Sequence, residues 1–171
     1  MSSPIPTTLD LVLASIQTRI MAVTEWPAER VLIDARADGE ASEIIVQADQ
    51  FVRIRVESRT PEQYTFEARG RINPELSVRI STVLLTRLDV DAINSDQTIL
   101  TDTSRGHLRA EHLLWDALII FQPMDVNENW LVREPIKPGS ATAPRKPPKG
   151  WMSSTLEFTA VIILDLDQDY Q

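Results

Sequence analysis

The stretch "LSVRISTVLLTRLDV", residues Leu76 to Val90, decides the fold class. Its apolar residues recur at even spacing, the period of a β-strand with one buried face. The residues expected on that face are Val78, Ile80, Leu84, Leu88 and Val90. Fifteen strand residues would span roughly 50 Å at about 3.3 Å each. Because that exceeds the width of a small domain, we expect the strand to project or to bend.

Two other long segments alternate in the same way. "QFVRIRVES" (50–58) places apolar side chains opposite Arg53, Arg55 and Glu57, as in a half-buried antiparallel strand. "STLEFTAVIILDL" (154–166) also has Val161 and Ile163 on its second face, which is typical of a central strand covered on both sides. Three further strands are predicted at 30–35, 43–48 and 64–72, with turns at 59–63 and 73–75.

Two segments have helical periodicity. Thr7 to Val23 repeats apolar residues at steps of three and four, with Thr7 or Thr8 as the cap and Pro27 barring continuation. His107 to Phe121 repeats the pattern before Pro123. The element order predicts one α+β domain over 1–171, a mostly antiparallel sheet packed by an N-terminal helix and a second helix before the last strand.

A long polar connection, Gln122 to Gly150, separates the second helix from the last strand. Its part "REPIKPGSATAPRKPPKGW" (133–151) holds five of the eleven prolines and all three lysines. Prolines disfavour helix and sheet interior, so we expect an arm at about 122–150 that lies across a neighbouring subunit instead of its own core. The expected apolar anchors are Trp130, Leu131 and Ile136, and the expected positive contacts are Arg133, Lys137, Arg145, Lys146 and Lys149.

The predicted strands carry arginines at the positions opposite their apolar faces. If these strands pair, one face of the sheet becomes a mosaic of Arg and Glu. Such a face is either an ordinary solvated surface or a subunit interface in which charge pairs give specificity. The residues concerned are Arg53, Arg55, Arg69, Arg71, Arg79 and Arg87.

The chain is acidic, with a net charge of −8. This charge argues against nonspecific binding to the nucleic-acid backbone, which needs clustered Lys and Arg. Four aspartates in one Lys- and Arg-poor segment would repel DNA phosphates if they lined a passage; an outer-rim loop is the alternative. They are Asp89, Asp91, Asp96 and Asp102.

No motif predicts chemistry. His107 and His112 are five residues apart, about 140° around a regular helix, so they do not converge on one ion; a capping His107 and a His112 paired with Asp116 are expected instead. Asp165, Asp167 and Asp169 lack the glycine and glutamate of a calcium loop. Cysteines and nucleophile signatures are absent. We therefore expect no cofactor, no metal and no enzymatic activity.

The order of elements resembles the tail terminator or tail-completion (minor tail) proteins of long-tailed bacteriophages and prophages. Four segments carry the resemblance: "TTLDLVLASIQTRI" (7–20), "RINPELSVRISTVLLTRLDVD" (71–91), "GHLRAEHLLWDAL" (106–118) and "STLEFTAVIILDLDQ" (154–168). The resemblance implies a virion protein of the tail or neck, made in the host cytoplasm, that forms a ring with six-fold symmetry. The implied partners are further copies of itself, the tail tube protein and neck or connector proteins, with DNA passing through the lumen unbound.

Three alternatives stay open on the sequence alone. One is a neck or stopper connector at the head–tail interface. The second is a small metal-dependent hydrolase using His107, Glu111 and His112. The third is a monomeric binding module. No membrane contact is expected, because the longest apolar runs have five residues.

Overall fold

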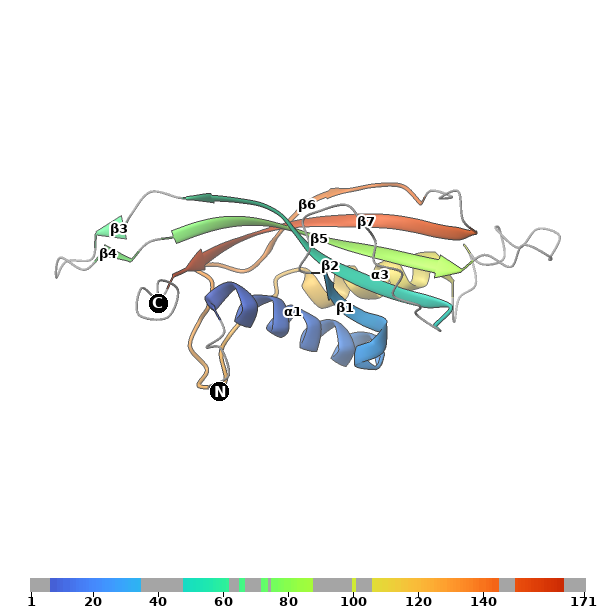
Figure 1. Ribbon diagram of the computed structural model, residues 1–171, viewed down its shortest axis with the longest axis horizontal. Helices are drawn as coiled ribbons and strands as arrows, with labels where there is room; N and C mark the ends of the chain where they lie inside the picture. The colour runs from blue at the N-terminus through green and yellow to red at the C-terminus, as the bar shows by residue number, and fades with distance from the viewer. Residues whose placement is uncertain are drawn as a thin grey trace, which may run out of the picture.

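The computed structural model describes residues 7–34, 48–61, 65–66, 72–73, 75–87, 100, 106–144 and 150–164. In these residues a five-stranded sheet carries two helices against one of its faces, so the fold is α+β, as expected (Figure 1). Among the described residues, no helix combines the length and apolar character needed to cross a bilayer.

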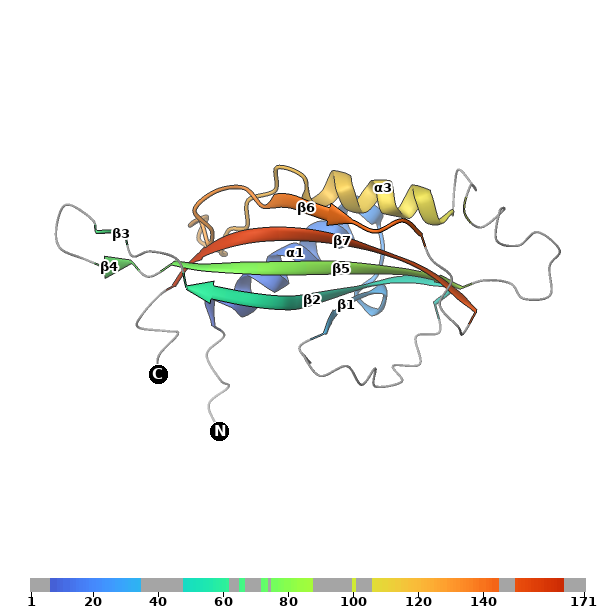
Figure 2. The same cartoon turned by 90° about the horizontal axis from the view of Figure 1, so that it is seen from above.

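The strand order of the sheet is β1-β2-β5-β7-β6 (Figure 2). Neighbouring strands are antiparallel except β1, which pairs with β2 in parallel. The sheet is therefore mostly antiparallel, as predicted, although the sequence did not indicate which strand would be parallel. The strands are β1 (Val31–Asp34), β2 (Gln50–Pro61), β5 (Glu75–Arg87), β6 (Lys137–Ala141) and β7 (Trp151–Ile163).

Strand β5 is the centre of the sheet and corresponds to the long predicted strand. It pairs with β2 from Leu76 to Thr86 and with β7 along its full length. Its even-numbered residues from Val78 to Thr86 face the helices and are buried, while Arg79 and Arg87 on the other face are exposed. The same parity holds in β7, where Phe158 lies opposite Ile80. The alternation seen in the sequence therefore identifies the core.

Helix α1 (Thr8–Thr24) begins at the predicted cap. Thr7 accepts a hydrogen bond from the amide of Asp10, and the Asp10 carboxylate accepts one from the amide of Thr7, a capping box. The helix ends at Glu25, which has φ 58°, just before Pro27 and the single 3-10 turn η1 (Ala28–Arg30). The buried face that packs on the sheet consists of Val12, Leu13, Ile16 and Ile20.

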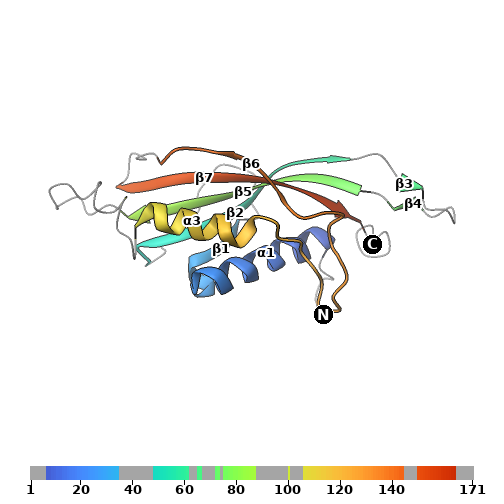
Figure 3. The ribbon, with the colours of Figure 1, turned by 180° about the vertical axis from the view of Figure 1, so that it is seen from behind.

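Helix α3 (His107–Leu118) lies beside α1 on the same face of the sheet (Figure 3). Arg19 of α1 donates from Nε to the carbonyl of Ala117 at 3.2 Å, which joins the two helices. The helix ends three residues earlier than the sequence suggested. Ile119 is extended and Ile120 has φ 62°, an unfavourable conformation for a β-branched residue.

Three other predicted segments differ from the structure. The turn expected at 59–63 is strand through Pro61, because β2 continues past a bulge between Val56 and Ser58. The strand predicted at 64–72 is represented by two short antiparallel strands, β3 (Thr65–Phe66) and β4 (Ile72–Asn73). The strand predicted at 43–48 lies outside the described residues apart from Ala48.

The prediction of an arm that avoids its own core is wrong for the described part, 122–144. Leu131 and Ile136 are buried in the subunit's own core, and Val132 bridges Ile162 of β7. Arg133 pairs with the nearly buried Glu75 of β5 at 2.6 Å. The two apolar anchors were identified correctly, but they hold the segment to its own sheet.

Strand β6 shows how a proline-containing segment can join the sheet. It is an edge strand, where Pro138 leaves no interior hydrogen bond unmade. Gly139 lies so close to β7 that an added Cβ would meet the carbonyl oxygen of Glu157 at 3.1 Å. The composition that suggested an arm is thus also the composition of an edge strand.

The core assignment predicts a contrast between adjacent residues of β7. Phe158 is buried against Trp115, with ring centroids 5.6 Å apart, whereas Thr159 faces away from the helices. Phe158→Ala should lower the free energy of unfolding by about 3–5 kcal/mol. Thr159→Ala should lower it by about 1 kcal/mol or less. Denaturant unfolding of both variants measures this, and equal losses would contradict the assigned parity.

Candidate functional site

The face of the sheet opposite the helices is the first candidate surface, and we call it the open face. No described helix covers it (Figures 1 and 3). It is formed by the odd-numbered residues of β5 and β7 and of β2 before its bulge. As expected, Arg53, Arg55, Glu57 and Arg79 belong to this face, so it is the mosaic of charges that the strand pattern predicted.

The β1 edge of the open face holds a cluster of two arginines around one carboxylate. Arg53 contacts the Asp34 carboxylate at 2.6 Å and Arg55 contacts the same oxygen at 3.2 Å. The side chains of Arg53 and Asp34 are each only 13% exposed, and the Nε of Arg53 has no hydrogen-bond partner. Since they already bind a carboxylate of their own subunit, these arginines also have a structural role in joining β1 to β2.

One end of the open face is aromatic. Phe51 of β2 and Trp151 of β7 meet edge to face with centroids 5.4 Å apart, although β5 separates the two strands. The guanidinium of Arg87 lies 5.1 Å above the Trp151 ring and 3.6 Å from the carboxylate of Asp49. Arg87 remains about half exposed. This end therefore combines an apolar base with an accessible cation, the composition favoured at protein interfaces.

Arg79 differs from the other arginines of the open face. It is exposed and forms no ion pair with any residue that the structure describes. Nearby carboxylates are engaged locally: Glu57 accepts a hydrogen bond from Ser81, and Glu157 accepts one from Ser140. Of the predicted interface arginines that the structure describes, Arg79 is therefore the one whose charge is most available to a partner.

The remaining predicted site residues divide into two groups. Trp130 is exposed, and Lys137 is exposed and donates to Glu134 at 2.7 Å. The others lie outside the described residues, so their predicted interface or lumen roles stay predictions. These are Arg69, Arg71, Arg145, Lys146 and Lys149, and the aspartates Asp89, Asp91, Asp96 and Asp102.

His107 occupies a buried polar chain and does not cap its helix; the N-cap is Gly106. The imidazole has no solvent exposure. Its Nδ1 is 2.8 Å from the hydroxyl of Thr86, and its Nε2 is 3.0 Å from the hydroxyl of Ser154. Gln50 donates to Thr86 at 3.0 Å and extends the chain to β2. Residues from β2, β5, β7 and α3 thus meet at one end of the core.

The hydrogen-bonded side chains around His107 include a serine and a histidine, as a Ser–His catalytic pair does, but solvent does not reach them. Ser154 is 1% exposed, so no substrate can reach its hydroxyl in this conformation. Desolvation lowers the pKa of His107 from its ordinary value of 6.5 to about 4, so the ring is neutral at pH 7. Both ring nitrogens have hydroxyl partners, which satisfies a buried polar group. The polar chain is therefore a structural feature that orients α3 on the sheet.

The residues of the hydrolase alternative do not converge. His107 is in the core, whereas His112 is exposed and pairs with Asp116 at 3.3 Å, as expected from the sequence. Within the described residues, no group of three His, Asp or Glu side chains could hold a metal ion. The hydrogen-bonded group around His107 was not predicted from the sequence. Thr86 and Ser154 are polar residues at helix-facing positions of predicted strands, and that pattern indicates a buried polar group.

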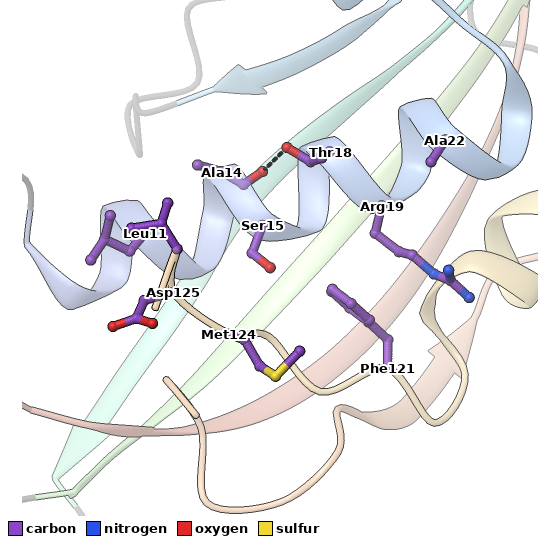
Figure 4. A pocket seen from close by; sticks show the side chains of 10 residues that line it. Leu11, Ala14, Ser15, Thr18, Arg19, Ala22, Phe121, Met124 and Asp125 are labelled. Carbon is purple, nitrogen blue, oxygen red and sulfur yellow. Dashed lines mark hydrogen bonds between the residues drawn. The ribbon is translucent and has the colours of Figure 1, made fainter. Parts of the chain in front are cut away.

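The second candidate surface is a groove on the outer side of α1, which we call the α1 groove (Figure 4). Its cavity volume is about 430 Å³. Small side chains of α1 form one wall, and Phe121 and Met124 from the segment after α3 form the other. The full lining is Leu11, Ala14, Ser15, Thr18, Arg19, Ala22, Phe121, Met124, Asp125 and Val126.

Comparisons with known proteins identify no family. No protein-family model matches the sequence, and no curated protein is similar to it. Among solved structures, the chain is similar to one described as "Virion of native gene transfer agent (GTA) particle", with a TM-score of 0.48 and 12% identity. The match covers 89% of this chain and 94% of the other. A similarity of this size carries no argument about function.

The buried histidine predicts how stability depends on pH. The unfolded chain takes up a proton near pH 6.5 and the folded chain only near pH 4, so the free energy of unfolding falls as the pH drops through this window. Each pH unit is worth about 1.4 kcal/mol, so the full effect is about 3 kcal/mol. His107→Gln should be less stable than wild type at pH 7, and the gap should shrink toward pH 4.

His112, the other histidine of the chain, supplies the matched control. His112→Gln removes an exposed imidazole and should follow the wild-type curve of stability against pH. Urea unfolding at several pH values from 7 to 4 gives all three curves. If the difference in unfolding free energy between wild type and His107→Gln stayed constant from pH 7 to pH 4, the lowered pKa assigned to His107 would be contradicted.

Proposed function

We propose that this chain is a structural protein of a phage-like virion that forms a closed ring at the end of the tail tube and joins it to the neck, letting DNA pass. The observation that supports this most directly is the open face. A sheet of five strands presents aromatic, arginine and carboxylate side chains together on a surface that no described helix covers. Among the residues that the structure describes, no comparable arrangement of reactive groups supports catalysis.

A ring of identical subunits requires two different complementary surfaces on each subunit. The open face offers one such surface, with Arg79 and Arg87 as its accessible cations. The chain as a whole is acidic, with 25 Asp and Glu against 17 Lys and Arg. A neighbouring copy therefore presents carboxylates to these arginines, and charge complementarity favours the head-to-tail contact. The same acidity allows DNA to pass without adhering.

The proposal also includes the position of the protein. The sequence resembles tail terminator and tail-completion proteins, and the described order, in which α1 comes before β1 to β5 and α3 before β6 and β7, is compatible with that resemblance. We accordingly propose a hexamer that contacts the tail tube on one side and neck proteins on the other. A neck or stopper position would be recognised by particles in which the ring lies against the capsid portal.

Reversal of the available charge tests the proposed interface. Arg79→Glu should fold as wild type, because its exposed side chain makes no ion pair with the described residues. Its incorporation into particles should fall by at least about tenfold, the effect of about 1.4 kcal/mol per contact. The matched control is Arg109→Glu, the same charge reversal at an exposed position of α3 on the helix side.

Incorporation is measured by quantifying the chain in purified particles relative to the tube protein, and circular dichroism establishes that both variants are folded. Normal incorporation of Arg79→Glu would remove the open face from the contact. Electron microscopy of wild-type particles tests the ring itself: a six-fold ring at the tube end is expected, and scattered single copies would contradict the proposed function.

A further inference from the structure

Exposed large apolar side chains are concentrated in the segment after α3, which forms one wall of the α1 groove. Six such residues occur in the described part of the chain, and five of them lie between Ile119 and Trp130. Val126 is 98% exposed and also lines the groove, as does Met124. An exposed apolar cluster that adjoins a groove is the signature of a binding surface for another molecule.

The segment that presents these side chains is a structured hairpin, Pro123 to Leu131. Met124 bridges Trp130, and the amide of Leu131 donates to the carbonyl of Pro123. Asp125 closes the turn by accepting from the amides of Asn127 and Asn129, each at 2.8 Å, and from the side-chain amide of Asn129 at 2.9 Å. The hairpin therefore holds Val126 in place at its tip, so a partner would not have to order it first.

The opposite wall of the groove is shaped to accept a helix. Ala14, Thr18 and Ala22 follow one another at intervals of four along α1, so they form a straight row of small side chains. From Ala14 to Ala22 the row is about 12 Å long, a little over two helical turns. Small side chains allow a second helix to approach, and Phe121 and Met124 provide apolar contacts along one side (Figure 4).

The charges around the groove determine what kind of helix fits. Asp10 lies one turn before Ala14 on the same row, and Asp125 lines the groove near Leu11 (Figure 4). The hydrogen bonds from Asn129 lower the pKa of Asp125, so it is ionised at neutral pH. Arg19, the one cation among the described lining residues, donates to the Ala117 carbonyl and lies 5.7 Å from the centre of the Phe121 ring.

A second copy of this chain fits the groove poorly. The chain carries a net charge of −8, so a second copy approaches the acidic rim against a net electrostatic repulsion. The hairpin and the groove also lie side by side, and two copies could exchange them only around a two-fold axis. A head-to-tail ring has no such axis between neighbours. The symmetry argument rests on the proposed ring, whereas the charge argument is independent of it.

We propose that the α1 groove binds a helical segment of a different protein, one with an apolar face bordered by lysine or arginine. The apolar face packs on Ala14, Ala22 and Met124, and Val126 encloses it from the hairpin side. The basic residues lie against Asp10 and Asp125. In a ring, this contact joins the subunit to a protein outside the ring and leaves the open face for the neighbouring subunit.

The isolated chain and two synthetic peptides test the proposal. One is a fluorescently labelled amphipathic peptide of leucine and lysine, about four helical turns long; the other has glutamate in place of every lysine. The lysine peptide should bind in anisotropy titrations, more weakly as salt is added, and the glutamate peptide should bind at least tenfold more weakly. Val126→Ser and Ala14→Gln should each weaken lysine-peptide binding at least fivefold.

Leu108→Ser is the control, because Leu108 is an exposed apolar residue of α3 that does not line the groove; its affinity should equal that of wild type. Equal affinity of all four proteins for the lysine peptide would show general attraction to an acidic protein and overturn the proposal. Sedimentation tests whether a second copy occupies the groove. If wild type self-associates and Val126→Ser does not, a second copy is the occupant and the proposal is overturned. Neither readout requires a ring, so failure here is distinct from failure of the proposed function.

Discussion

The structure depends on β5 being hydrogen-bonded on both sides along nearly all of its length. Because side chains alternate along a strand, this pairing fixes which residues of β2 and β7 share a face with Val78, Ile80 and Leu84. A shift by one residue would bring Arg53, Arg55 and Arg79 to the helices and expose the core. Burial on one face and charge on the other are thus two consequences of the same register, and the open face exists because both helices are used on the opposite side.

Two sets of side-chain contacts hold other segments of the chain against the two ends of the sheet. The chain of Gln50, Thr86, His107 and Ser154 places polar groups in the core and satisfies them mutually, which fixes the start of α3 over β5 and β7. At the other end, the ion pair between Arg133 and Glu75 and the burial of Leu131 and Ile136 hold the segment before β6 on the sheet. Because that segment is held on the sheet, the hairpin at Pro123 to Leu131 lies beside α1. The position of the groove therefore depends on these contacts.

The sequence predicted what depends on local periodicity. Alternation identified β2, β5 and β7, and the capping residue Thr7 identified the start of α1. Features that depend on pairing between distant segments were missed: β1 is parallel, and β6 joins the edge despite Pro138. Composition alone cannot distinguish an edge strand from an extended arm, because both tolerate proline and exposed polar residues. His107 was misassigned because its partners, Thr86 and Ser154, lie on strands far away in the sequence.

The central claim is that the open face is buried when subunits assemble. The chain contains no cysteine, so Ser58→Cys introduces a single thiol, at an exposed position that pairs with Arg79 on this face. Maleimide labelling of this variant should be rapid in the isolated subunit and at least tenfold slower in assembled particles, with Glu29→Cys, at an exposed position of η1, as the reference. Equal labelling rates of Ser58→Cys in subunit and particle would contradict the account.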